Sequence, residues 1–117
     1  MNSEELFLID KKIAVNRDEV IISFGAFNGL DDIHRVDVLM YENIPEDIGN
    51  YDGHEVSMDD TDGRLFAYGA NAEKLFKIMQ PLLKQFAFLE RALVYLRFNK
   101  EDGTHSEIEF RLDDIEG

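Results

Sequence analysis

The sequence contains no cysteine, no tryptophan and only two prolines among its 117 residues. The lack of cysteine excludes disulfide bonds, thiolate chemistry and Cys-ligated zinc, and it is typical of a cytoplasmic protein. No apolar run approaches the roughly 18 residues that a membrane-spanning helix needs. The first residues are acidic and precede only a short apolar stretch, which is not the pattern of a signal peptide. We therefore expect a cytoplasmic protein that does not insert into membranes.

Basic residues are scarce, because 12 Lys and Arg stand against 25 Asp and Glu, for a net charge of −13. Nucleic acids and anionic membranes both require a basic surface, so we expect neither as a partner. Residues 31–62 hold eleven acids and one base, Arg35, which gives a local charge of −10. One explanation is a solvated surface that pairs internally with the basic stretch at residues 63–100. The other is a surface that attracts a cationic partner.

Hydrophobic residues make up 44% of the chain, enough for one core in a single domain spanning residues 1–117. The clearest pattern is helical, over residues 71–91, where apolar residues recur at steps of four and three. Asn71 is a suitable N-cap for this helix. Because Pro81 lies inside it, we expect either a kinked helix or two short helices that meet at residues 80–81. The expected core combines its apolar face with strand residues: Leu75, Met79, Leu82, Phe86, Phe24, Val94, Leu96 and Phe110.

Most of the remaining chain shows the alternation of β-strands. Residues 6–15 are expected to form a strand or small hairpin, with a short helix as the alternative. Strands are also predicted at residues 19–27 and 34–42, on either side of an Asn-Gly turn. In the second of these, the residues expected to face inward are Val36, Val38 and Met40. Residues 43–53 are predicted to form a long loop and residues 113–117 a frayed acidic tail.

Two hairpins are predicted, and their turn residues set the register. Each turn, at residues 60–63 and 100–103, suits a three-residue loop closed by a left-handed glycine. The first register pairs Asp60 with Arg64, Met58 with Phe66 and Val56 with Tyr68. The second pairs Leu96 with Ile108, Val94 with Phe110 and Ala92 with Leu112. The order of strands, helix and two strands predicts an α+β fold, an antiparallel sheet of about five to seven strands covered on one face by a single Pro-kinked helix or two short helices.

No catalytic constellation is found in the sequence. Residues 59–63 partly match a calcium-binding loop, but the first and last ligand positions are wrong and a hairpin turn explains the same residues. Asp37 is the one carboxylate in an apolar setting, and we expect it on the solvent face of its strand. The histidines have no metal-ligand spacing; they are His34, His54 and His105. We therefore expect no enzyme activity, no cofactor and no metal.

The loop at residues 43–53 places apolar side chains among carboxylates, as interface hot spots do. The residues predicted to bind a partner are Ile44, Glu46, Asp47, Ile48, Tyr51 and Asp52. The alternative is that the three apolar ones pack back onto the sheet. In general character, a small acidic domain of this kind resembles bacterial immunity and anti-toxin proteins, which block basic enzymes. This resemblance implies a non-catalytic domain that binds a cationic protein.

Two other functions remain open from the sequence. One is a ligand-binding or enzymatic domain with a pocket between helix and sheet, lined by histidines and carboxylates. The other is an oligomeric building block joined through an exposed sheet face that carries Phe27, Leu39 and Tyr41. The chain is accordingly expected to be either a monomer or a homodimer.

Overall fold

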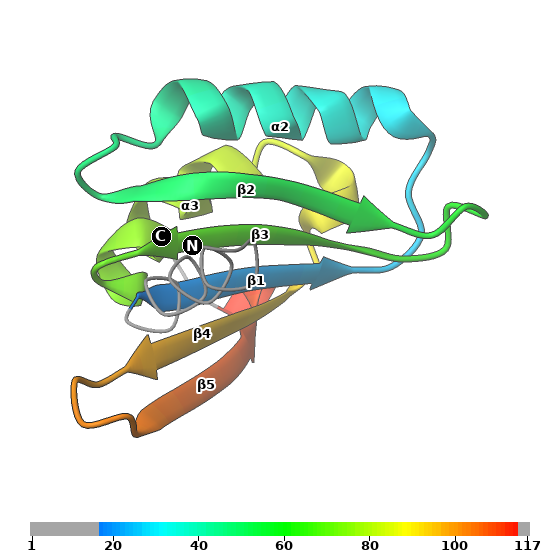
Figure 1. The fold of residues 1–117 in the computed structure, drawn as a ribbon. Helices are drawn as coiled ribbons and strands as arrows, with labels where there is room; N and C mark the ends of the chain where they lie inside the picture. Colours follow the sequence, from blue (N-terminus) through cyan, green and yellow to red (C-terminus); the bar gives the residue numbers. More distant parts are fainter. Residues whose placement is uncertain (1–16, 115–117) are drawn as a thin grey trace, which may run out of the picture.

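The structure, a computed structural model, describes residues 17–114. The strand or hairpin predicted at residues 6–15 lies outside these residues. Within them, five strands form one antiparallel sheet in the order β2-β3-β1-β4-β5 (Figure 1). The strands are β1 (Asp18–Phe24), β2 (Gly49–Val56), β3 (Gly63–Gly69), β4 (Leu93–Asn99) and β5 (His105–Arg111), and the helices are α2 (Leu30–Asn43) and α3 (Ala72–Leu83). The α+β prediction is confirmed, and the order β1-α2-β2-β3-α3-β4 with β5 appended is the split βαβ topology of ferredoxin-like sheets.

Helix α2 occupies the segment where a strand was predicted at residues 34–42, and that prediction is wrong. Ile33, Val36 and Met40 are fully buried, whereas Val38 is exposed. A step of four residues returns to the same face of both a helix and a strand, so Val36 and Met40 fit either pattern. Two acids in the first turn, which suit a helix N-terminus, favour the helix. The sheet is therefore covered by two helices in the described residues, and a helix separates β1 from β2.

Helix α3 begins as predicted and ends earlier than predicted. The side chain of Asn71 accepts a hydrogen bond of 3.1 Å from the N–H of Lys74, which confirms the N-cap. The helix continues through the exposed Pro81 and ends at Leu83, so its predicted extension to residue 91 is wrong. A 3-10 turn at Ala87–Leu89 follows. Because the chain leaves the helix direction after Leu83, the helical spacing no longer determines which later side chains face the core.

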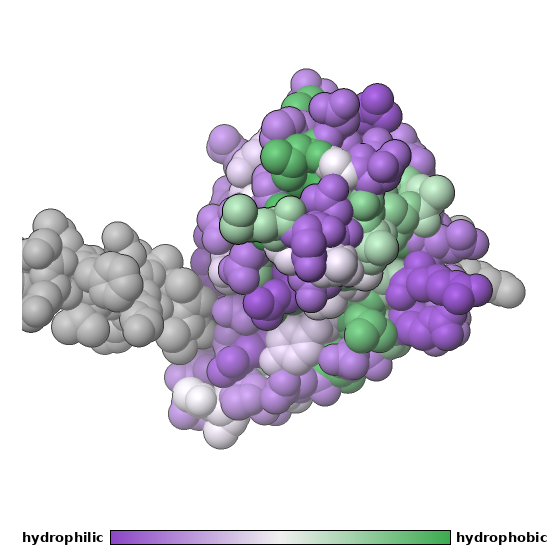
Figure 2. Space-filling view, turned by 90° about the vertical axis from the view of Figure 1, so that its right-hand side faces the viewer, coloured by the Kyte–Doolittle hydropathy of each residue, from purple (hydrophilic) through white to green (hydrophobic). Residues whose placement is uncertain are grey.

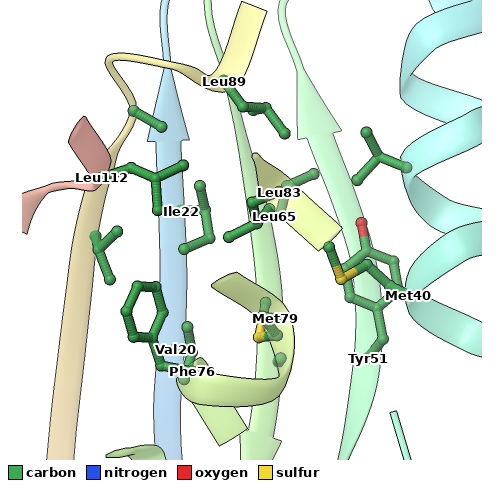
Figure 3. Close-up of a cluster of buried hydrophobic side chains, with 14 of the residues drawn as sticks. Val20, Ile22, Met40, Tyr51, Leu65, Phe76, Met79, Leu83, Leu89 and Leu112 are labelled. Atoms are coloured by element: carbon green, nitrogen blue, oxygen red, sulfur yellow. The ribbon is translucent and has the colours of Figure 1, made fainter. Parts of the chain in front are cut away.

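One hydrophobic cluster fills the space between the sheet and the two helices (Figure 3). Its largest fully buried members include Ile22, Ile33, Met40, Leu65, Leu75, Met79, Leu83, Leu89 and Leu112. Of the predicted core, the buried residues are Phe24, Leu75, Met79, Val94 and Leu96, and the half-buried ones are Leu82, Phe86 and Phe110. The face of α3 that packs on the sheet is thus rotated toward Phe76 and Leu83, both of which are buried.

The β4–β5 hairpin has the predicted register. Leu96 pairs with Ile108 and Val94 with Phe110. The N–H of Leu112 donates a 2.8 Å hydrogen bond to the carbonyl of Ala92, which extends the same pairing. The turn contains a left-handed glycine, Gly103, with φ of +88°. After β5, residues Leu112–Asp114 form a 3-10 turn, so this start of the predicted tail is ordered.

The register and turn predicted for the β2–β3 hairpin are wrong. Val56 pairs with Gly63, and the connecting loop spans residues 57–62. The left-handed residue is Asp60, with φ of 60°, and not Gly63. The reason is the hydroxyl of Ser57, which accepts hydrogen bonds from the N–H groups of Thr61 and Asp62 and so closes a wider loop. Two strand boundaries also differ, because β1 ends at Phe24 and β2 begins at Gly49 inside the predicted loop.

Candidate functional site

Asp37 joins helix α2 to strand β2. One of its carboxylate oxygens accepts a 2.7 Å hydrogen bond from the Tyr51 hydroxyl, and the other lies 2.7 Å from Nδ1 of His54. Tyr51 and His54 are three positions apart, so a regular strand would point them to opposite faces. A bulge between Tyr51 and Gly53 inserts an extra residue and turns both side chains toward the helix. The prediction that Asp37 lies on a solvent-facing strand is therefore wrong.

The environment of this contact keeps Tyr51 neutral. Burial, and next the hydrogen bond and charge of Asp37, raise the pKa of Tyr51 well above its usual range. The Tyr41 ring meets the Tyr51 ring edge-on at 5.0 Å, and the His34 ring lies 6.4 Å from that of His54. Two of the three histidines thus approach each other, although their sequence spacing gave no signal for it. Among the described residues, no group of three or more potential metal ligands converges.

A hollow of about 170 Å³ lies between the end of α2 and the start of β2. It is lined by Met40, Tyr41, Ile44, Glu46, Gly49, Asn50 and Tyr51. Three of the residues predicted to bind a partner, Ile44, Glu46 and Tyr51, therefore lie together. The hollow is too small for a typical ligand, since such pockets run from about 300 to 1,000 Å³.

The predicted partner-binding residues separate into two groups by exposure. Ile44 and Tyr51 are buried and Ile48 is half-buried. These three side chains pack back onto the sheet, which is the alternative that the sequence left open. The carboxylates Glu46, Asp47 and Asp52 are exposed. The predicted loop therefore presents charge to solvent but not the apolar anchors expected from it.

Exposed apolar side chains instead lie on the outer face of α2. Val38 is 54% exposed, Tyr41 61% and Leu30 49%, and they follow one helical face together with the exposed His34. A shallow hollow there is lined by His34, Arg35, Val38, Leu39 and Glu42. We define the α2 surface as this face with the acids beside it: Leu30, Asp31, His34, Val38, Tyr41, Glu42, Glu46 and Asp47. It escaped sequence reasoning because the segment was assigned to a strand.

The side of the molecule at which α2 begins is mostly hydrophilic (Figure 2). Figure 2 shows the side where α2 begins and the β2–β3 loop projects, with small hydrophobic areas inside a mostly hydrophilic surface. Met58, in that loop, is fully exposed. The sheet face predicted for oligomerisation is not formed by the residues expected on it, because Leu39 and Tyr41 belong to α2 and Phe27 is buried.

Comparisons of the chain with protein-family models, with curated proteins and with solved structures find no match. None of the helices in residues 17–114 has the length and apolar character needed to cross a membrane. What the structure defines is therefore a class: a small α+β domain with an acidic, partly apolar helix face.

Proposed function

We propose that this chain is a non-catalytic binding domain whose α2 surface contacts a cationic region of a partner protein. One observation carries the proposal: Val38 and Tyr41, two exposed apolar side chains of α2, lie inside the most acidic stretch of the chain. Eight of the eleven acids in residues 31–62 are exposed. The single base of that stretch, Arg35, is paired with Asp32 at 3.2 Å and so does not offset the exposed acids.

The two kinds of side chain have different roles in this proposal. The carboxylates steer a positively charged partner toward the surface and raise the association rate. Val38 and Tyr41 then lose water against the partner and slow its dissociation. Asp37, with both oxygens engaged by β2, holds the helix in place. A cytoplasmic inhibitor of a basic enzyme, in the manner of immunity proteins, is the function that fits this arrangement.

The proposal is tested by capturing partners from native lysate at low salt and measuring their binding kinetics. The double variant Glu46→Gln/Asp47→Asn should slow association several-fold. The difference should shrink with added salt, because exposed charges are screened beyond about 8 Å at physiological ionic strength. Tyr41→Ala should instead speed dissociation by roughly tenfold or more, the scale of a hot-spot residue. Tyr41 is exposed, so its loss should leave the fold intact.

A matched control removes the same charge elsewhere. Glu90 and Glu101 are exposed and lie outside residues 31–62. The variant Glu90→Gln/Glu101→Gln should therefore change association much less than the α2-surface variant does. If the two variants slow association equally, only the net charge matters. If neither slows it at low salt, the acids serve solubility and the α2 surface is not the binding site.

A further inference from the structure

Strand β5 is an open edge of the sheet. It is the last strand in the order β2-β3-β1-β4-β5, and no described strand pairs with its outer side. The opposite edge, β2, is interrupted by a bulge and packs against α2. Strand β5 has neither protection, because it pairs regularly with β4 along its length and six of its seven residues are exposed. Such an edge is a template for pairing with another chain.

The hydrogen-bonding pattern shows which backbone groups are open. The N–H of Leu112 donates a hydrogen bond to the carbonyl of Ala92, so Leu112 and Ala92 form a hydrogen-bonded pair of the β4–β5 ladder. Antiparallel ladders alternate, so the even-numbered residues of β5 bond to β4. The N–H and C=O groups of Glu107 and Glu109 therefore point away from β4, toward the open side.

The side chains of β5 form two stripes. Ile108 and Phe110 lie on the helix side, where Phe110 contacts Phe76 of α3 edge-on at 5.4 Å and Ile108 is 49% exposed. Glu107 and Glu109 lie on the other side and are exposed. The edge thus offers alternating carboxylates and apolar groups beside open backbone groups.

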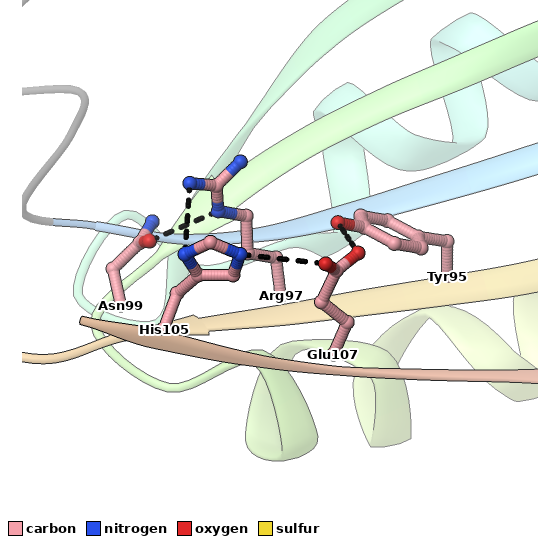
Figure 4. Close-up of polar contacts among 5 residues, drawn as sticks. All are labelled: Tyr95, Arg97, Asn99, His105 and Glu107. Atoms are coloured by element: carbon pink, nitrogen blue, oxygen red, sulfur yellow. Dashed lines mark hydrogen bonds and ion pairs between the residues drawn. The ribbon is translucent and has the colours of Figure 1, made fainter.

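A polar network on the open face of the sheet holds β5 against β4 (Figure 4). The Tyr95 hydroxyl donates to one oxygen of Glu107, and the other oxygen lies 3.3 Å from Nε2 of His105. A guanidinium nitrogen of Arg97 lies 3.4 Å from Nδ1 of the same histidine. Glu109 takes no part in this network. Its carboxylate is therefore the one most available to an incoming cation.

We propose that β5 accepts an added strand from a partner protein, an extended segment in which basic and apolar residues alternate. The basic side chains would face Glu107 and Glu109, and the apolar ones would face Ile108 and Phe110. Backbone hydrogen bonds supply affinity in this mode of recognition, and the alternating side chains supply specificity. The α2 surface is not involved, because α2 packs on the opposite edge of the sheet.

The strand added to β5 is not expected to be the β5 strand of a second copy of this chain. Two copies of β5 can pair antiparallel, with matching faces and most of the strand overlapping, in three registers, in which the two-fold axis passes through Glu107, Ile108 or Glu109. An axis through Glu107 or Glu109 places that glutamate opposite the same glutamate of the second copy. An axis through Ile108 places Glu107 opposite Glu109 of the second copy. Like charges directly opposite each other destabilise a strand pair. Two chains of net charge −13 also repel each other.

The test uses a synthetic peptide with the sequence Val-Lys-Val-Lys-Val, matched to residues 106–110 of β5, so that its lysines face Glu107 and Glu109 and none faces Arg111. A block-order peptide of the same composition is the control, because it has the same charge without the alternation. NMR titration of the ¹⁵N-labelled chain should show shifts in β4 and β5. Amide exchange at Glu107 and Glu109 should slow by roughly two- to tenfold at saturation, as a gained hydrogen bond would give. The block-order peptide should give no such protection.

Two variants at one position separate charge from backbone pairing. Glu109→Gln should weaken the alternating peptide by roughly two- to fivefold, the scale of a cross-strand ion pair. Glu109→Pro removes an outward N–H, which an edge strand tolerates, and should abolish the protection at Glu107. If this variant fails to fold, the glutamine variant and the exchange data still decide.

Three results would overturn the proposal. Equal binding of both peptides would mean that charge alone attracts them. Shifts confined to α2 would place the binding elsewhere. Slow exchange at Glu107 and Glu109 without peptide, together with a dimer in light scattering, would mean that a second copy occupies the edge.

Discussion

Tyr51 is a buried hydrogen-bond donor to Asp37, and its ionisation is therefore linked to folding. The folded-state pKa of Tyr51 lies above the usual value, which is about 10 in an unfolded chain. Above that pH the unfolded chain loses a proton that the folded chain retains. The stability that this group contributes is present below about pH 10 and is lost as the pH rises further.

Removing the Tyr51 hydroxyl tests this linkage. Tyr51→Phe should lower the free energy of unfolding at pH 7 by about 1 kcal/mol, because Asp37 loses a donor. The variant should also lose less stability than the wild type between pH 9 and about pH 11. Urea unfolding at both pH values measures the difference. Tyr41→Phe is the matched control, because that residue is exposed; parallel curves for wild type and Tyr51→Phe would contradict the linkage.

Gly63, the first residue of β3, and Gly103, in the β4–β5 turn, are needed for different reasons. At Gly63, an added Cβ would lie 2.6 Å from the Phe24 ring and 2.7 Å from Val56. At Gly103 there is open space, but the φ of +88° disfavours any residue with a side chain.

Substitution by asparagine and by alanine distinguishes steric crowding at Gly63 from the positive φ at Gly103, because asparagine tolerates the left-handed conformation better than alanine does. We expect Gly103→Ala to cost about 1–2 kcal/mol and Gly103→Asn less. At Gly63 the order should reverse, since the larger side chain meets more of Phe24. Thermal unfolding of the four variants gives the comparison, and the same order at both sites would refute the distinction.

At the level of elements, α3 contributes buried side chains along its whole length, from Ala72 to Leu83. Met79 is fully buried, whereas Phe86, beyond the end of the helix, is half-buried and meets Phe88 edge-on at 6.0 Å. The sequence pattern predicts equal burial for Met79 and Phe86. Because the helix ends at Leu83, Phe86 is less buried than Met79.

Alanine substitutions at Met79 and Phe86 test this difference in burial through the loss of stability that each causes. Met79→Ala should cost about 2–5 kcal/mol, the usual range for a buried methionine. Phe86→Ala should cost less than the about 3–5 kcal/mol of a fully buried phenylalanine. Denaturant melts give both values. A larger loss for Phe86 than for Met79 would contradict the half-buried position of Phe86 beyond the end of the helix.

Across the whole molecule, the negative charge is concentrated at one edge of the sheet, and the two edges differ in how they are covered. One edge, β2, carries α2 and its acids, and the other, β5, pairs with no further strand within residues 17–114. The segment with a charge of −10 includes α2, β2 and the loop to β3. Both proposed contacts therefore involve cationic partners, but they use separate surfaces and can fail separately.

The features of this fold that depend on neighbouring residues could be predicted from the sequence. It predicted the α+β class, the cap at Asn71, the β4–β5 register and the left-handed Gly103, because each depends on neighbouring residues. It also located the acidic stretch, which is a matter of composition.

The remaining features could not be predicted, because they depend on contacts between residues that are distant in the sequence. Val36 and Met40 fit a strand and a helix equally, and packing against the sheet, together with the acids of the first turn, selects α2. The bulge that turns Tyr51 and His54 toward Asp37 depends on a helix 14 or more residues away. Val38, predicted to face inward, is exposed and Ile44, predicted to bind a partner, is buried because of that placement, so this part of the candidate site could be found only in the folded chain.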